Sequence, residues 1–324
     1  MKNIIVISVF TGLCGMTTSC SDGGDNTLQP VATTVNLEGA IGVSTRGVIG
    51  SGYEKELPVS FARQDETTAG SGAYGGYMLC PAIREGGKGN RPVSFTDLQL
   101  YPADGCNIRM QGYYPSKGDG VVADAVNGTV QFLVDGSTDI MATDRLTGNA
   151  YAPFSLCTFR HLLTQIQLVC YSRDAEKWGR VIRIEVLDVH TRQELRFFSE
   201  PLSLADASSA DDIKTLRVSD IPEFTLPVVA DGDDLPDPQG IVLLPLSSFK
   251  VSVDGALHLR IVTTRDGYGN ELETVSEVSV KVDGGFQAGK SHVISLLFTG
   301  GNRIEFVVVG VAAWTEREEE NIPI

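Results

Sequence analysis

Hydrophobic and polar residues alternate along most of the chain, in short segments bounded by Gly, Asp, Asn or Pro. In residues 274–282, for example, Val278, Val280 and Val282 alternate with charged or hydroxyl-bearing residues. Side chains two residues apart lie on the same face of a strand, so this pattern is typical of strands with one buried face and one wet face. Helical periodicity is almost absent, and the sequence therefore predicts an all-β protein. Strands are expected at residues 34–43, 128–134, 158–171, 180–189, 240–246, 256–263, 274–282, 292–298 and 303–314.

The chain is too long for one core of ordinary size. It has 324 residues, of which 42% are hydrophobic, enough to fill two cores. A turn-rich segment ends at Ala152 and Pro153, and the long strand predicted at 158–171 follows it. We therefore predict an N-terminal β-sandwich over residues 20–152 and a C-terminal β-sandwich over residues 153–324.

The first residues have the layout of a secretory signal. Lys2 is followed by an apolar run from Ile4 to Leu13, and then by small polar residues ending at Cys20. The run is too short to span a bilayer as a helix. Because Cys20 follows two threonines and a serine, it resembles the cysteine of a lipobox, which is lipidated and becomes the mature N-terminus. Residues 1–19 are therefore predicted to be a lipoprotein signal peptide, with ordinary signal-peptidase cleavage as the alternative.

Four cysteines lie beyond the leader: Cys80, Cys106, Cys157 and Cys170. An exported protein can form disulfides, and four thiols allow three pairings that the sequence does not rank. One pairing is disfavoured, because a single strand over residues 155–172 would hold Cys157 and Cys170 roughly 40 Å apart. The alternative is that all four are small buried hydrophobic residues.

Residues 284–291, Gly-Gly-Phe-Gln-Ala-Gly-Lys-Ser, match the P-loop pattern for nucleotide binding. A P-loop requires a helix directly after it, because the amides at the helix N-terminus hold the phosphates. Residues 292–298 alternate like a strand instead. The sequence therefore predicts that this segment binds no nucleotide.

Other chemistry has little support in the sequence. The net charge of -15 makes nucleic acid an unlikely partner. The four histidines are isolated, with no zinc-binding His-Glu-x-x-His motif, and there is no Gly-x-Ser-x-Gly nucleophile motif. We therefore predict no metal, no cofactor and no enzymatic activity. A periplasmic hydrolase assembled from residues distant in sequence is an alternative.

Three segments resemble the fimbrillin family, the Mfa-like pilins. Residues 159–166, Phe-Arg-His-Leu-Leu-Thr-Gln-Ile, are similar to the family's F-x-H-x-L-[AT]-x-[IV] strand. Residues 112–115, Gly-Tyr-Tyr-Pro, resemble the end of an aromatic strand in the first domain, and residues 286–314 resemble the C-terminal pattern. Within the first segment His161 is interpreted as a structural strand residue rather than a catalytic one.

The resemblance implies two transthyretin-like β-sandwich domains and a role as a structural subunit of an adhesive surface pilus, or fimbria. It also implies export as a lipoprotein to the outer membrane, removal of an N-terminal strand by a trypsin-like protease, and polymerisation with other pilus subunits by strand exchange. Residues 21–45 contain no Lys or Arg. Arg46, which is followed by Gly47, is therefore the first site that such a protease could cut and is the predicted cleavage site. The strand that would be removed has one apolar face, formed by Val35, Leu37, Ile41 and Val43. Its loss would leave a groove that a partner's strand can fill.

A donor strand is predicted near the C-terminus. Residues 303–314 are apolar on both faces, and a strand of this kind needs cover on both sides. It is either the donated strand or a central strand of its own domain. One of its faces carries Ile304, Phe306, Val308, Ala312 and Trp314.

A surface glycan-binding lipoprotein would share this leader and these β-domains, and is the main alternative function. It would need exposed aromatic platforms, and Trp178 and Trp314 are the only tryptophans. The sequence leaves open whether a pilus subunit of this kind forms the stalk, the tip or the anchor.

Overall fold

The computed structural model describes residues 33–42, 49, 51–218, 221–251 and 255–313. Strands make up 49% of the structure and helices 4%, which confirms the all-β class. Among these residues the helical elements are α1 (Ser247–Val251) and two 3-10 turns, η1 (Ala175–Lys177) and η2 (Ala210–Asp212). No helix among the described residues is long and apolar enough to cross a membrane.

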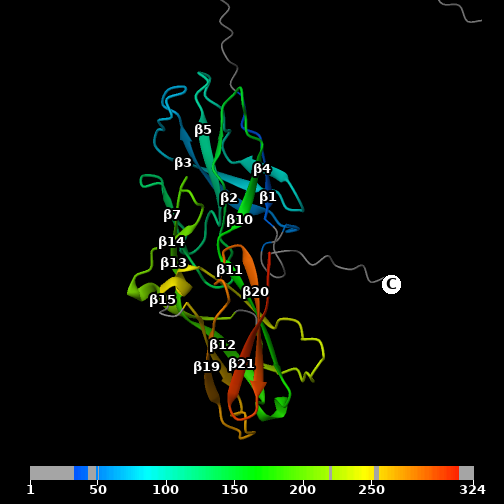
Figure 1. The fold of residues 1–324 in the computed structure, drawn as a ribbon. Coiled ribbons are helices and arrows are strands. Elements are labelled where there is room, and N and C mark those ends of the chain that lie inside the picture. The colour runs from blue at the N-terminus through cyan, green and yellow to red at the C-terminus, as the bar shows by residue number, and fades with distance from the viewer. Residues whose placement is uncertain (1–32, 43–48, 50, 219–220, 252–254, 314–324) are drawn as a thin grey trace, which may run out of the picture. The chain divides into compact units, whose positions relative to one another are not determined.

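The first sheet closes on itself as a seven-strand barrel (Figure 1). Its strands follow the order β2-β3-β4-β1-β10-β8-β5, and β5 pairs back to β2. Side chains alternate between the inside and outside of the barrel; in β3, for example, Cys80, Ala82 and Arg84 point inward. The strands are β1 (Leu37–Ile41), β2 (Leu57–Asp65), β3 (Met78–Arg84), β4 (Arg91–Phe95), β5 (Ile108–Tyr114), β8 (Met141–Thr143) and β10 (Leu156–His161), with β9 (Leu146–Gly148) attached to β5.

Aromatic rings fill the barrel. The ring of Phe61 lies 5.3 Å from that of Phe95 and 6.0 Å from that of Phe159, both edge to face. Gly112 faces this cluster, and a Cβ atom at that position would lie 2.8 Å from the Phe61 ring. The glycine of the Gly-Tyr-Tyr-Pro segment is therefore required by close packing.

Two further sheets share a second core. Their strand orders are β17-β11-β20-β21 and β15-β12-β18-β19, with β16 paired to β12. Trp178 is fully buried in this core, with its ring 5.2 Å from that of Phe298. The strands are β11 (Thr164–Ser172), β12 (Arg180–His190), β15 (Ile213–Arg217), β16 (Phe224–Thr225), β17 (Gly240–Leu244), β18 (Leu257–Thr263), β19 (Thr274–Val280), β20 (Lys290–Thr299) and β21 (Arg303–Ala313).

A small fourth sheet has the order β14-β13-β7-β6. A third hydrophobic cluster lies under it and includes Tyr113 of β5, Leu195 of β13 and Leu243 of β17. The cores of the described residues are thus linked through buried side chains. The bounds are β6 (Val122–Asp124), β7 (Thr129–Leu133), β13 (Arg192–Arg196) and β14 (Leu204–Asp206).

The single strand predicted at 158–171 is wrong. β10 pairs with β1 and β8, whereas β11 pairs with β17 and β20. The break falls at Leu162 and Leu163, which are buried apolar residues and not turn formers. The Leu162 amide donates to the Ile140 carbonyl at 2.8 Å, a non-local contact that the sequence pattern does not reveal.

The domain boundary at Ala152 and Pro153 stays a prediction.

Residues 284–291, which match the P-loop pattern, continue directly into β20, as the strand prediction required. Its Gly289 has a positive φ of 67°, and its amide donates to the Leu163 carbonyl at 2.8 Å. This segment is therefore a turn into a strand, without the helix N-terminus that phosphate binding uses.

All four described cysteines are free and buried. Burial raises the pKa of Cys80 to about 11 and the pKa values of Cys157 and Cys170 to about 12. The thiolate is the reactive form, so these raised pKa values leave very little of it at pH 8.

We expect iodoacetamide at pH 8 to leave Cys80, Cys106, Cys157 and Cys170 unmodified in a folded chain that begins at Ser21. The same chain in denaturant should gain four adducts, counted by intact mass. Modification of any of the four in the native state would contradict the burial of that thiol.

Candidate functional site: the strand that closes the barrel

β1 is one of the strands that form the barrel wall. It pairs antiparallel with β4, from Leu37↔Val93 to Gly39↔Arg91, and parallel with β10, from Glu38↔Leu156 to Ile41↔Phe159 (Figure 1). The barrel closes between β4 and β10 only through β1. Without β1, both neighbours would expose unpaired backbone groups along one edge.

The inward face of β1 and of the residues just before it is buried, as the sequence predicted for the described members of this row. Val35, Leu37 and Ile41 are each 4% exposed and belong to the barrel core. Burial of three such side chains contributes roughly 5–8 kcal/mol. At Gly39, between two of them, a Cβ atom would lie 3.2 Å from Val93 and 3.3 Å from Phe159. The barrel wall therefore has room for only the smallest residue at this position.

The chain before β1 separates from β4. The Val35 amide donates to the Gln99 carbonyl, and the Tyr101 amide donates to the Thr33 carbonyl, both at 2.9 Å. A groove of about 660 Å³ opens beside this segment, and its lining includes the exposed Leu98 and Leu156. β1 is thus less completely covered at its N-terminal end.

A buried arginine holds the middle of β1. The side chain of Arg84 is fully buried, and its Nε donates to the Gly39 carbonyl at 2.9 Å. The guanidinium also donates to three further backbone carbonyls, of Glu85, Gly87 and Gly89. Burial, and secondarily the positive charge of Arg91, lower the pKa of Arg84. A carbonyl-lined site is therefore what accommodates this cation.

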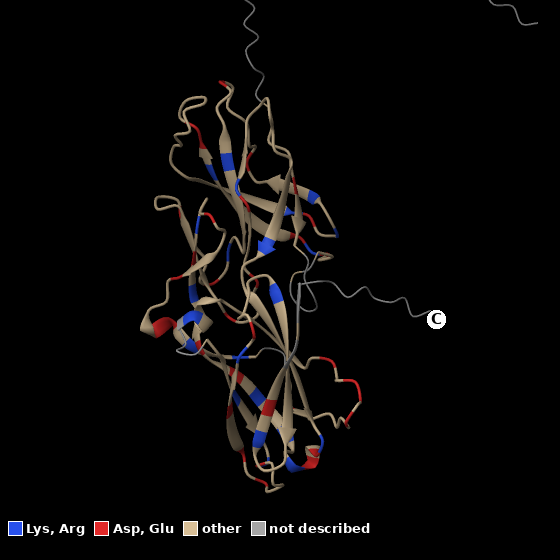
Figure 2. Cartoon of the chain, viewed as in Figure 1, with Lys and Arg blue, Asp and Glu red and all other residues tan. Residues whose placement is uncertain are grey.

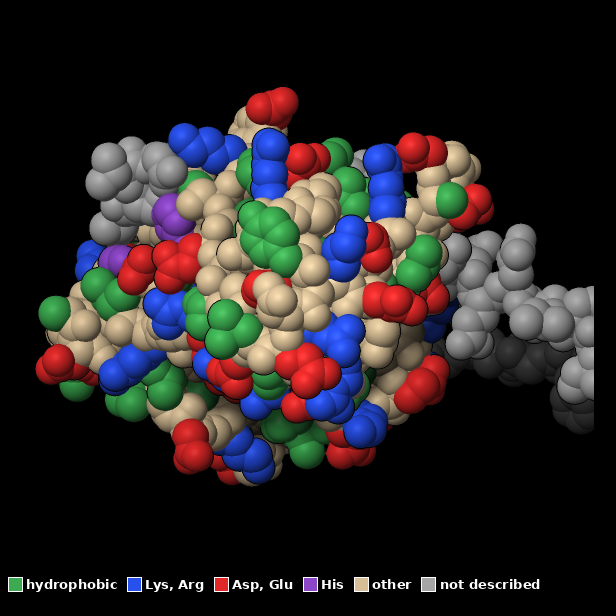
Figure 3. Space-filling model, turned by 90° about the horizontal axis from the view of Figure 1, so that it is seen from below, with side chains coloured by type: hydrophobic (Ala, Val, Ile, Leu, Met, Phe, Trp, Pro, Cys, Tyr) green, Lys and Arg blue, Asp and Glu red, His purple; other side chains and the backbone are tan. Residues whose placement is uncertain are grey.

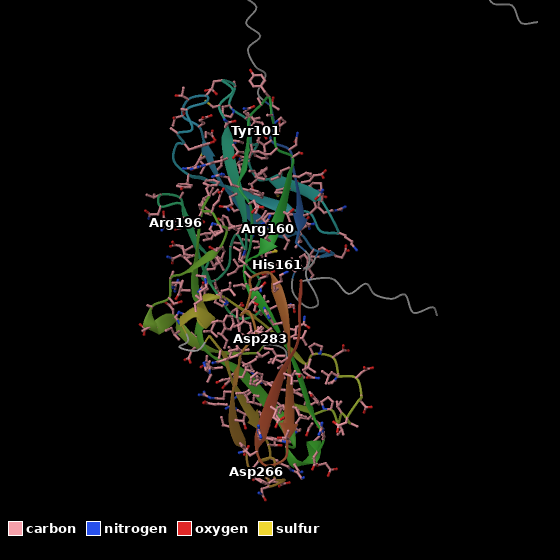
Figure 4. All side chains as sticks on the ribbon, in the orientation of Figure 1. Tyr101, Arg160, His161, Arg196, Asp266 and Asp283 are labelled. Atoms are coloured by element: carbon pink, nitrogen blue, oxygen red, sulfur yellow. The ribbon has the colours of Figure 1, made fainter. Side chains whose placement is uncertain are left out.

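A histidine and an aspartate lie at the C-terminal end of β1. His161 is the last residue of β10 (Figure 4), and its Nδ1 lies 2.5 Å from Oδ2 of Asp139. Its Nε2 lies 3.1 Å from the carbonyl oxygen of Gly42, directly after β1. Both side chains are buried, at 3% and 0% exposed. Burial raises the pKa of Asp139, and the neighbouring imidazole opposes that rise.

The predicted processing residues lie outside the described residues. This applies to Cys20, Val43, Arg46 and Gly47. Ile41 and Gly42, which precede this segment, are described, so the structure shows how β1 is held up to that point. Lipidation and cleavage stay predictions.

The candidate donor β21 is an edge strand. It pairs with β20 on one side, and the sheet order ends with it. Phe306 is 37% exposed and Val307 is 58% exposed, whereas Ile304 is half-buried against the second core. The other predicted donor side chains, Val308, Ala312 and Trp314, lie outside what the structure describes. Within the part of the chain that the structure describes, β21 is therefore an edge strand and not a central one. Its role as donor stays a prediction.

The histidines are not gathered into one site. His190 contacts Asp206 (Nδ1 to Oδ2, 2.7 Å), and His258 contacts Ser279 (Nδ1 to Oγ, 2.9 Å). No group of three His, Cys, Asp or Glu residues in the described part of the chain could hold a metal ion.

Charges are distributed without a single dominant patch in the views shown. Lys and Arg are interspersed with Asp and Glu along the strands and loops (Figure 2), and the face in Figure 3 mixes hydrophobic, basic and acidic side chains. Ion pairs such as Arg180–Glu223 at 2.8 Å are local. The prediction that nucleic acid is not a partner still rests on the net charge.

Arg84 and Asp139 were not predicted as parts of this site. The burial of Arg84 could have been predicted from the sequence, because it lies two and four positions after Ala82 and Cys80 and therefore on the same inward face of the strand. For Asp139 the signal is absent, because it meets His161 across 22 residues of sequence.

Comparison with known proteins gives matches at the level of structure. No family model and no curated protein sequence matches the chain. The fold is similar to that of a "putative cell adhesion protein" of Bacteroides uniformis (TM-score 0.59, 12% identity, covering 87% of this chain and 98% of that chain). A "putative cell adhesion protein" of Bacteroides ovatus gives a TM-score of 0.57 at 13% identity, covering 88% and 98%. A fimbrial protein of Bacteroides vulgatus matches at a TM-score of 0.44 and 13% identity, covering 86% and 99%.

These structural neighbours agree with the predicted resemblance to the fimbrillin family. At 12% and 13% identity the two stronger matches establish a shared fold and not a shared function. The third match is too weak to carry an argument by itself.

Proposed function

We propose that the protein is a structural subunit of a cell-surface fimbria involved in adhesion, and that β1 is replaced by a strand of a neighbouring subunit during assembly. The observation that carries this proposal is that β1 alone closes the barrel between β4 and β10. The two stronger structural neighbours, named as putative cell adhesion proteins, support a role in adhesion and a location at the cell surface. In this proposal the barrel core and the core shared by the two further sheets belong to two transthyretin-like domains.

The proposed pathway begins with export as a lipoprotein carrying its lipid on Cys20, anchored in the outer membrane. A trypsin-like protease then cuts after Arg46 and releases the segment that contains β1. A strand of another pilus subunit, with residues 303–314 as the candidate, enters the open barrel wall. No cofactor, nucleotide or catalytic step is part of this role.

The glycan-binding alternative gains little from the structure. Trp178 is buried and its Nε1 donates to the Thr299 carbonyl at 3.0 Å, so this tryptophan offers no surface platform. Trp314 lies outside the described residues.

Electron microscopy with an antibody to this protein tests the proposal on intact cells. We expect labelled fibres on cells that express the wild-type chain. Cells that express Cys20→Ala should lack these fibres, because the precursor would not be anchored for assembly. Label spread evenly over the surface, with no fibres, would favour the glycan-binding alternative.

A further inference from the structure

The C-terminal end of β1 is the end that a cut after Arg46 would set free. Two hydrogen bonds hold Gly42, the residue directly after β1. The Gly42 amide donates to the Phe159 carbonyl at 2.8 Å, and the Gly42 carbonyl lies 3.1 Å from Nε2 of His161. A strand with a free end opens from that end, because each terminal contact can break without the next. Among the described residues, the contacts of Gly42 are therefore the first that the opening of β1 from this end would break.

The hydrogen-bond partners of the ring indicate which nitrogen donates to Gly42. A carbonyl oxygen can only accept, so Nε2 of His161 carries the proton that it donates to Gly42. Nδ1 and the Asp139 carboxyl oxygen, 2.5 Å apart, share a second proton. The pair therefore holds both protons and has no net charge, as either imidazolium with carboxylate or imidazole with carboxylic acid. Asp139 thereby keeps the ring in the protonation state in which Nε2 donates.

The surroundings hold this pair in place. The Leu162 amide donates to the carbonyl of Ile140, which links the chain after His161 to the chain after Asp139. Gly289, in the turn before β20, packs against the His161 backbone, since a Cβ atom there would lie 3.3 Å from its carbonyl oxygen. The ring is thus attached to the part of the molecule that stays behind when β1 leaves.

The charged and titratable side chains around the His161–Asp139 pair either face away from it or are uncharged. Arg160, next to His161 in sequence, pairs with Asp144 at 2.6 Å on the exposed side of β10. Tyr114 lies near Asp139, and burial raises its pKa to about 12, so it is uncharged at neutral pH. The carboxyl oxygen of Asp139 that does not face His161, Oδ1, has no hydrogen-bond partner among the described residues.

We propose that His161, oriented by Asp139, is a latch on the removable strand: its bond to the Gly42 carbonyl sets how readily β1 opens. His161 is in this sense a positioning residue. Its consequence for assembly rests on the proposed function, whereas the latch itself can be tested on the uncut chain. Breaking the bond should speed the opening of β1 without changing the rest of the barrel.

Two substitutions separate the two bonds of the ring. In His161→Asn the amide can replace Nδ1 and keep the contact with Asp139, but it does not reach Gly42. In His161→Gln the amide can replace Nε2 and keep the contact with Gly42. His190→Asn is the matched control, because His190 forms a second His–Asp pair, with Asp206, away from β1.

Hydrogen–deuterium exchange on the uncut full chain gives the readout. We expect the amides at the end of β1 to exchange about tenfold faster in His161→Asn than in the wild type, the size of one hydrogen bond of this kind. In His161→Gln and His190→Asn the same amides should exchange within about twofold of the wild-type rate. Equal exchange in His161→Asn and the wild type, or equal acceleration in His190→Asn, would overturn the latch.

Nitrogen NMR of the wild-type imidazole keeps the proposal testable if His161→Asn does not fold. Nε2 should carry a slowly exchanging proton, and an Nε2 without a proton would overturn the latch. The two proposals can also fail separately. If exchange accelerates as expected but no cut variant polymerises, the fimbrial role is wrong and the latch stands. If the cut wild type polymerises while exchange in His161→Asn is unchanged, the latch is wrong and the fimbrial role stands.

Discussion

Cleavage after Arg46 is expected to convert the monomeric chain into polymers, and the Arg46→Ala chain is expected to stay monomeric. Removing β1 takes the buried side chains of Val35, Leu37 and Ile41 out of the barrel, a loss of roughly 5–8 kcal/mol of burial. The open edges of β4 and β10 then favour pairing with a strand from another copy. Brief trypsin treatment followed by light scattering measures the change in mass.

A second basic residue makes this experiment sharper. Lys55 is the next Lys or Arg after Arg46 and is exposed, so trypsin could also release β1 by cutting there. The comparison is therefore best made in a Lys55→Ala background, with and without Arg46→Ala, and with the cut position read by mass spectrometry. If the chain trimmed after Arg46 remains a monomer, or if the double variant polymerises equally well, the role assigned to Arg46 is wrong.

Replacing the buried Arg84 by methionine should lower the free energy of unfolding by about 3–5 kcal/mol. Methionine keeps much of the side-chain volume but leaves four backbone carbonyls without their donor, including that of Gly39 in β1. Denaturant unfolding measures the difference. The matched control is Arg196→Met, on an exposed residue (Figure 4) that forms a long ion pair with Glu194, at 3.9 Å. It should change stability by less than about 0.5 kcal/mol. A loss below about 1 kcal/mol for Arg84→Met would show that the carbonyl-lined site is not a major source of stability.

Strands that depend on local alternation could be predicted from the sequence. The expected segments 180–189, 256–263 and 292–298 correspond to β12, β18 and β20, because a two-residue period is visible within each segment. Closure of the barrel could not be predicted. It depends on the pairing of β2 with β5, in which Ser60 lies opposite Tyr113, and no local pattern encodes that contact.

In the candidate site, the buried face of β1 could be predicted from the sequence, whereas the contacts of His161 could not. Leu37 and Ile41 were placed correctly on one buried face, because they are four positions apart and side chains of a strand return to the same face every second residue. His161 was expected to be structural, but its partners, Asp139 and Gly42, could not be predicted because they come from distant parts of the chain. The break at Leu162 was missed because a change of sheet can occur at buried leucines without a turn residue.

The direction of β1 has a consequence for polarity along a fibre. β1 is antiparallel to β4 and parallel to β10, so β4 and β10 themselves run in opposite directions. Any strand that enters between them must be parallel to one and antiparallel to the other, whichever way it points. Backbone pairing alone therefore does not choose the orientation of an incoming strand. That choice falls to the side chains, and above all to where the incoming strand carries a residue small enough for the narrow position now occupied by Gly39.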